Sequence, residues 1–368
     1  MTGVYLHVPF CRKRCNYCDF CSSVASREAI SEYVTALITS ISAFDIDALP
    51  VDTVYLGGGT PSLLSGDEMR AVLDAVRAKF ALTDDCEITT EANPCTVSPE
   101  LLSDYHAAGI NRISFGIQSC KVNELNTLGR LHTFEDAENA VKYAHDAGIT
   151  NISADLMMGI PHQTPATLRE SIDRIVSLGV THISAYMLKV EPGTRFDSDD
   201  IRALLPDDDT VSDMYLETVE NLSQKGYEQY EISNFAVPGC ESRHNLKYWT
   251  GEPYIGFGPS AHSYFGGRRF YIPDDISAFL CDPLSPPETE DDNPDLLEEF
   301  IMLGLRLRKG ISLDKLQTMG GNPDKALSAI RPFVNADLIS VKDNNLSLSP
   351  RGFLVSNGII SRIIDSQI

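Results

Sequence analysis

Short runs of β-branched, aromatic and other apolar residues alternate with longer amphipathic stretches through the first half of the chain. The short runs predict strands, and the apolar spacing of three or four residues in the longer stretches predicts helices. The expected strands are residues 4–8, 53–56, 87–90, 112–117, 152–157 and 182–187. The expected helices include residues 31–44, 66–79, 135–147 and 166–178.

Six strand–helix units in succession predict a parallel sheet whose outer face is covered by helices. Turn signals such as Ala147-Gly148 and Leu178-Gly179 stand where a helix gives way to a strand. The expected fold class is therefore α/β, and an open or closed (β/α) barrel suits the spacing better than a repeat solenoid. In such barrels the chemistry lies at the carboxyl ends of the strands.

The pattern changes after about Gly226. Residues 226–281 are rich in aromatic and polar side chains with little periodicity, and residues 282–294 carry prolines and acids, as a linker does. Helical patterns then return, with a hairpin expected near residues 338–348. The expected division is a core at residues 1–225, an extension at 226–281, a linker at 282–294 and a small α/β domain at 295–368.

The net charge of the chain limits the classes of partner that the protein is expected to bind. Its 368 residues include 52 acidic and 30 basic side chains, for a net charge of −22. Such acidity repels phosphate backbones and anionic membrane surfaces, so neither nucleic acid nor a membrane is an expected direct partner. No apolar run is long enough to span a bilayer, and the N-terminus lacks the pattern of a secretory signal. A cytoplasmic protein of undetermined oligomeric state is the expectation.

Four of the nine cysteines fall within eleven residues, directly after the first expected strand. They are Cys11, Cys15, Cys18 and Cys21, spaced C-x3-C-x2-C-x2-C, and in a reducing compartment such a group indicates metal or redox chemistry. Thiolates this close suit a [4Fe–4S] cluster better than zinc, although zinc and a simple electron-transfer cluster stay open as alternatives. Three cysteine ligands would leave one iron open, as catalysis requires.

Polar groups gather at the ends of the expected strands. The glycine-rich residues 57–62 follow the second strand, where backbone N–H groups can hold a carboxylate or a ribose. Glu91, Gln118, Arg130 and Asp155 each stand at or just beyond a strand end. Taken singly, each has the alternative of a plain hydrogen-bonding or ion-pairing role at the rim. Their shared place favours one binding site.

The segment HVPFCRKRCNYCDF resembles the C-x3-C-x2-C signature of the radical S-adenosylmethionine (SAM) superfamily. The resemblance implies that Cys11, Cys15 and Cys18 hold a [4Fe–4S] cluster. It also implies that SAM binds the open iron and that one electron cleaves SAM to a 5′-deoxyadenosyl radical. Cys21 stands outside the signature and is expected to be a spare thiol.

Further segments, among them YLGGGTPSLL, NRISFGIQS, ADLMMGIP and RHNLKYW, are similar to the coproporphyrinogen-oxidase-like family and extend the resemblance from Tyr5 to Ser263. The likeness implies a partial (β/α)6 TIM-like radical SAM barrel with a small C-terminal α/β domain like that of the oxygen-independent coproporphyrinogen oxidase. It also implies SAM contacts from Tyr5, Tyr17, Gly58, Gly59, Thr60, Glu91, Gln118, Arg130 and Asp155.

Two branches of that family compete: the oxygen-independent coproporphyrinogen III dehydrogenase of heme synthesis, which is an enzyme, and a heme chaperone. The chaperone branch is favoured because Cys11 stands almost at the start, Phe20 replaces a further cysteine of the dehydrogenase, and residues 244–249 match H-N-x-x-Y-W. This match implies that His244 ligates heme and that the partners are heme and apo-hemoprotein clients.

Two alternatives stay open beside these branches. His244 and Trp249 could do no more than pack the barrel against its C-terminal appendage. The protein could also be a cluster-carrying binding or electron-transfer module that never cleaves SAM.

Overall fold

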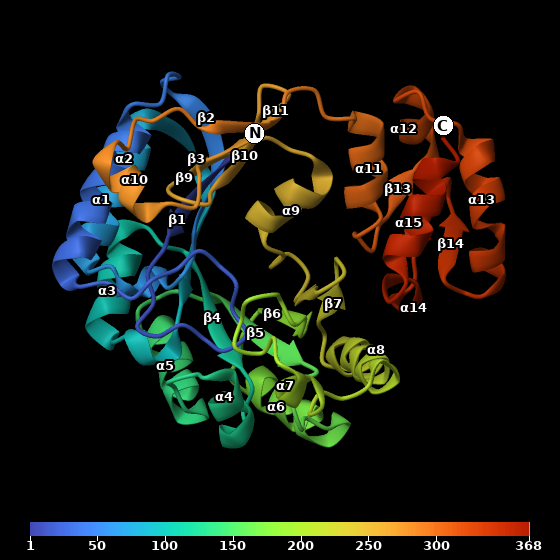
Figure 1. The fold of residues 1–368 in the computed structure, drawn as a ribbon, viewed down its shortest axis with the longest axis horizontal. Helices are drawn as coiled ribbons and strands as arrows, with labels where there is room; N and C mark the ends of the chain where they lie inside the picture. Colours follow the sequence, from blue (N-terminus) through green and yellow to red (C-terminus); the bar gives the residue numbers. More distant parts are fainter. Residues whose placement is uncertain (368) are drawn as a thin grey trace.

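The computed structural model describes residues 1–367, and its centre is a curved sheet of twelve strands (Figure 1). The strand order is β12-β11-β10-β9-β1-β2-β3-β4-β5-β6-β8-β7. Strands β1 to β6 are parallel and paired in chain order, which confirms the predicted partial (β/α)6 barrel. These strands are β1 (Thr2–Val8), β2 (Leu49–Gly58), β3 (Phe80–Ala92), β4 (Arg112–Gln118), β5 (Asn151–Met158) and β6 (His182–Met187).

Helices cover the outer face of this curved sheet (Figure 1). Several begin where the sequence provides a cap: the side chains of Ser65, Thr133 and Thr164 each accept a hydrogen bond from the third helical residue, whose side chain bonds back. The helices of this part are α1 (Arg27–Ser42), α2 (Gly66–Lys79), α3 (Pro99–Ala108), α4 (Val122–Leu128), α5 (Phe134–Asp146), α6 (Pro165–Ser177), α7 (Asp199–Arg202) and α8 (Asp208–Gln224).

The chain after α8 extends the same sheet at both edges. At one edge β8 pairs antiparallel with β6, and β7 pairs antiparallel with β8. At the other edge β9 pairs in parallel with β1 and continues into the antiparallel strands β10, β11 and β12. The outermost strand, β12, falls within the expected linker at residues 282–294; its four residues are all exposed and show no apolar alternation. The added strands are β7 (Glu228–Gln229), β8 (Asn234–Ala236), β9 (Tyr254–Phe257), β10 (His262–Phe265), β11 (Arg268–Tyr271) and β12 (Glu288–Asp291).

The C-terminal part, red in Figure 1, packs helices on a separate sheet of order β13-β15-β14. Its predicted hairpin is confirmed: β14 and β15 pair through Asp343 and Asn344, whose φ angles of 50° and 60° are those of a tight hairpin turn. The elements are α11 (Leu296–Gly304), β13 (Ile311–Ser312), α12 (Leu313–Thr318), α13 (Pro323–Asn335), β14 (Ile339–Lys342), β15 (Asn345–Leu348), α14 (Pro350–Phe353) and α15 (Ser356–Asp365).

Helix α9 (Arg243–Thr250) lies between the inner face of the barrel and the C-terminal part, whereas α10 (Ile276–Cys281) packs on α1 (Figure 1). The backbone N–H groups of Arg243 and His244 both donate to the Glu87 carboxylate of β3, at 3.1 Å. A carboxylate at a helix N-terminus satisfies the unpaired donors there and is favoured by the helix dipole. Among the helices of residues 1–367, none has both the length and the apolar character needed to cross a bilayer.

Candidate functional site

The loop between β1 and α1 carries the cysteine signature and is tied down on both sides. The Cys11 N–H donates to the Ser23 carbonyl at 2.9 Å, and the Asn16 N–H donates to the Leu128 carbonyl at 2.9 Å. His7 Nε2 lies 3.0 Å from the Cys21 carbonyl oxygen, so this histidine holds the loop backbone. These bonds fix the loop across the carboxyl ends of the strands.

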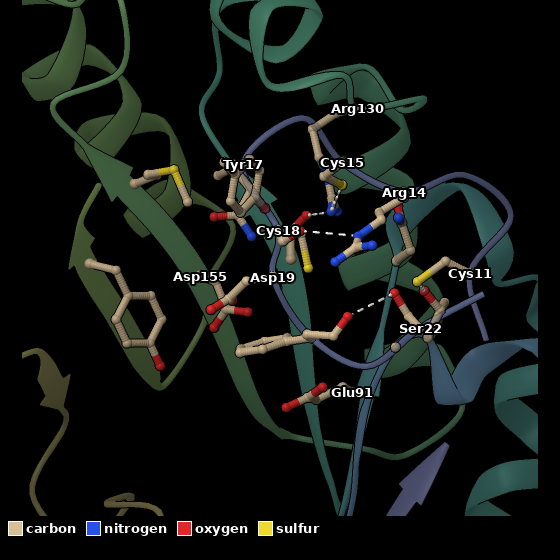
Figure 2. A pocket seen from close by; sticks show the side chains of 18 of the residues that line it. Cys11, Arg14, Cys15, Tyr17, Cys18, Asp19, Ser22, Glu91, Arg130 and Asp155 are labelled. Carbon is tan, nitrogen blue, oxygen red and sulfur yellow. Dashed lines mark hydrogen bonds between the residues drawn. The ribbon is translucent and has the colours of Figure 1, made fainter. Parts of the chain in front are cut away.

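Below this loop lies a cavity of about 480 Å³. Figure 2 shows the loop with Cys11, Cys15 and Cys18 passing over strands that carry Glu91 and Asp155. Nearly all the residues predicted to hold the cluster and SAM line this one cavity, although they come from different strand ends. They are Cys11, Cys15, Cys18, Tyr17, Gly58, Gly59, Thr60, Glu91, Gln118, Arg130 and Asp155.

Two of the three cysteine sulfurs accept hydrogen bonds from the cavity wall. The Thr60 hydroxyl donates to Cys11 Sγ at 3.3 Å, and Arg130 Nη1 donates to Cys15 Sγ at 3.4 Å. Burial raises the pKa of the Cys18 thiol to about 11. Donors aimed at sulfur stabilise thiolates, the form in which cysteine binds iron. Three thiols around one hollow, two of them with such donors, fit a [4Fe–4S] cluster.

The glycine-rich loop after β2 approaches the cysteine loop too closely for side chains. Gly58 has a φ of 105°, and a Cβ there would lie 2.5 Å from the His7 ring. A Cβ on Gly59 would lie 2.6 Å from the Phe10 carbonyl oxygen. The backbone itself therefore forms this wall of the cavity, as in other glycine loops that contact a ligand.

Two half-buried carboxylates, Glu91 and Asp155, face the cavity. Glu91 accepts hydrogen bonds from the Tyr55 hydroxyl at 2.9 Å and the Gly58 N–H at 3.2 Å, and Asp155 accepts one from Ser114 Oγ at 3.2 Å. Burial, with the nearby Asp155 charge, raises the pKa of Glu91 to about 7. Burial likewise raises the pKa of Asp155. Such a pair is suited to a cationic ligand, which relieves both penalties.

Gln118 and Arg130 have polar atoms that no described residue satisfies. Gln118 Oε1 and Arg130 Nε are both buried without a hydrogen-bond partner in residues 1–367. Gln118 also has a φ of 70°, an uncommon conformation for a residue with a side chain, of the kind that often marks a binding site. A free acceptor and a free donor beside two carboxylates fit a ligand that is itself both cationic and anionic, as the amino-acid part of SAM is.

His244 does not reach this cavity. Its ring is fully buried inside the barrel, with Nδ1 2.9 Å from Thr53 Oγ1 and Nε2 2.9 Å from the Tyr248 hydroxyl oxygen. Burial lowers its pKa to about 3, so the imidazole is neutral. Tyr5, predicted to contact SAM, packs on this ring at 6.4 Å between centroids and is not among the cavity-lining residues.

Comparison with known proteins connects this site to a family. The profile of the Radical SAM superfamily matches residues 5–175, and that of the HemN C-terminal domain matches residues 291–355. Proteins named heme chaperone HemW from Mycobacterium tuberculosis and Bacillus subtilis are 38% and 34% identical to this chain. These matches cover 98% and 99% of this chain, and 94% and 99% of the two relatives. The chain belongs to the HemW family.

A solved structure shares the fold of this HemW-family chain. The coproporphyrinogen III oxidase HemN from Escherichia coli, a radical SAM enzyme, superposes with a TM-score of 0.85 over 98% of this chain and 89% of its own. At 21% identity the likeness concerns the fold, and it confirms the expected architecture of barrel and C-terminal domain. Membership of the radical SAM superfamily implies a [4Fe–4S] cluster and SAM as bound groups.

The cavity of the HemW-family chain also includes residues that the sequence analysis did not single out. Ser114 and Gly116 alternate with Gln118 along β4, and Met157 follows Asp155 in the same way on β5. Residues two apart on a strand face the same side. This alternation is visible in the sequence once one member of each strand is assigned to the site.

Proposed function

We propose that this protein is a heme chaperone of the cytoplasm, which binds a [4Fe–4S] cluster, SAM and heme and delivers the heme to apo-hemoproteins. The observation that carries the proposal is the near-complete match to HemW proteins, which covers both the barrel and the C-terminal part. The site geometry supports it, because nearly all the residues predicted to hold the cluster and SAM line one cavity.

In this proposal the roles of the cavity residues follow from their chemistry. Cys11, Cys15 and Cys18 ligate the cluster, which when bound supplies an electron to SAM. Glu91 and Asp155 hold the cationic groups of SAM, since burial makes both carboxylates favour a positive neighbour. The list of SAM-holding residues is completed by Tyr17, Gly58, Gly59, Thr60, Gln118 and Arg130.

Ligation of the heme iron by His244 stays a prediction. Both ring nitrogens already have partners, in Thr53 and Tyr248, so ligation requires that one of these bonds is exchanged for a bond to iron. The low pKa of His244 keeps the imidazole neutral, which is the form that binds iron. We further propose that residues 295–368 act as a separate domain, joined to the barrel through residues 282–294.

The test is a heme titration and transfer assay on the protein with its cluster reconstituted under anaerobic conditions. We expect saturable, stoichiometric binding of hemin by absorbance, and faster heme transfer to a respiratory apo-hemoprotein than from a hemin–albumin control. Absence of saturable binding would overturn the proposal. Turnover of coproporphyrinogen III to protoporphyrinogen IX by the same preparation would instead establish the dehydrogenase alternative.

A further inference from the structure

A second cavity, of about 420 Å³, lies between the end of α9 and the C-terminal part. It is separate from the cluster cavity, and the two share no lining residue. Its size is within the range of small-molecule sites. Its lining residues include Trp249, Phe300, Lys309, Lys315 and Met319.

The walls of this second cavity are aromatic and aliphatic. Trp249, the only tryptophan of the chain, lines it together with Phe300 of α11. Glu299 is the one carboxylate among the lining residues, and its charge is balanced by Arg269, with Nε 2.6 Å from Glu299 Oε1. The interior therefore presents flat apolar surface without an uncompensated negative charge.

Two exposed lysines also line this cavity. Lys309 and Lys315 have no carboxylate within ion-pair distance among residues 1–367, and Lys315 Nζ lies 4.8 Å from the centroid of the Phe300 ring. The backbone at Lys309 is held by the Asn345 side-chain amide, which donates to the Lys309 carbonyl oxygen. In a chain of net charge −22, two uncompensated cations beside an apolar hollow form a local site for an anion with an apolar body.

The two ends of helix α9 lie in different environments. Its first turn places His244 in the barrel interior, held by Thr53 and Tyr248, whereas its last turn places Trp249 at the second cavity. The Tyr248 ring packs on Tyr254 at 4.6 Å between centroids, which fixes the helix between these two places. The two ends of the H-N-x-x-Y-W segment therefore face different parts of the molecule.

We propose that this second cavity binds a tetrapyrrole dicarboxylate, by stacking of the macrocycle on Trp249 and by ion pairs of its carboxylates with Lys309 and Lys315. The inference rests on the proposed heme-chaperone function and locates the ligand on this chain. Neither His nor Cys lines the cavity, and Met319 brings its only sulfur. Recognition therefore falls on the ring and the carboxylates, and the central iron is not required.

The test compares hemin with metal-free protoporphyrin IX on the full-length, cluster-reconstituted protein. We expect both to bind with dissociation constants within about threefold of each other, because the two share ring and carboxylates. The double variant K309E/K315E should weaken both by about tenfold or more. The matched control, K342E/R351E, makes the same charge change at exposed positions of the C-terminal part outside the cavity and should bind as the wild type does.

Each other result has a definite meaning. Binding of hemin without binding of protoporphyrin IX would place recognition at the iron, and would overturn the cavity proposal while leaving the chaperone function intact. Unchanged affinity of K309E/K315E, in a variant that still binds SAM, would also overturn it. A Trp249→Ala variant, expected to lose about fivefold in affinity, gives an independent measure of stacking. Failure of the wild type to bind either compound would overturn the proposed function itself.

Discussion

Replacement of His244 by Gln should cost the protein less stability in mild acid than at neutral pH. Gln can keep polar contacts to Thr53 and Tyr248, but it has no titrating proton. In the wild type, burial lowers the pKa of His244 from 6.5 to about 3. Between these values the unfolded chain binds a proton that the folded chain excludes, so acid favours unfolding of the wild type.

The size of this effect follows from the pKa of the unfolded chain. At pH 5.5, one unit below that pKa, protonation of His244 stabilises the unfolded state by about 1.4 kcal/mol, whereas at pH 7.5 the contribution is below about 0.1 kcal/mol. The cost of His244→Gln should therefore shrink by about 1.3 kcal/mol between pH 7.5 and pH 5.5. Any folded pKa well below 5.5 gives the same result.

The assay is urea unfolding at the two pH values, followed by the fluorescence of Trp249, which stands in the last turn of the same helix. His145→Gln, at an exposed position of α5, is the matched control for the loss of an imidazole. A cost of His244→Gln that is the same at both pH values would refute the conclusion that burial keeps this imidazole neutral.

Three further perturbations test the cluster cavity. Burial raises the pKa of Glu91 to about 7, so the affinity for cationic SAM, measured by calorimetric titration, should fall about tenfold from pH 8 to pH 6. The Glu91→Gln variant should bind SAM with little dependence on pH. An equally steep pH profile in this variant would contradict the role of Glu91. Gly59→Ala places a Cβ 2.6 Å from the Phe10 carbonyl oxygen, so it should lower the free energy of unfolding by about 1–3 kcal/mol and weaken SAM binding. Gly358→Ala, whose added Cβ would have no atom within 4 Å, is the control and should have neither effect. Cys21→Ala should leave the iron and sulfide content per chain unchanged, whereas Cys18→Ala should lower it; a matching loss in both would make Cys21 a ligand.

The local elements were predictable because their signals are local. The cap residues Ser65, Thr133 and Thr164 stand in the sequence where the helices begin, and the apolar runs of the first six strands are bounded by turns. The cluster cavity followed from the same logic, since parallel strands bring their carboxyl ends together. What the sequence lacked was any signal for β12, because four exposed residues need no apolar alternation.

The environment of His244 shows that a sequence motif alone does not decide the role of a residue. A histidine four residues before Tyr248 on a helix is compatible with a metal ligand and with a buried hydrogen-bond network, because the spacing is identical in both. The difference depends on Thr53 and Glu87, which come from strands more than 150 residues away. Such long-range partners leave no pattern near the motif, so the burial of His244 became visible only in the folded chain.

The pairing of β1 with β9 has a consequence for synthesis of the chain. Leu6 pairs with Phe257, so one edge of the first strand stays unpaired until a strand about 250 residues later has been synthesised. At ordinary rates of translation this is a delay of about 12–50 s, during which the strand that leads into the cysteine loop has an open, aggregation-prone edge. The barrel therefore closes late on the ribosome, and a nascent chain stalled before β9 is expected to need protection until translation resumes.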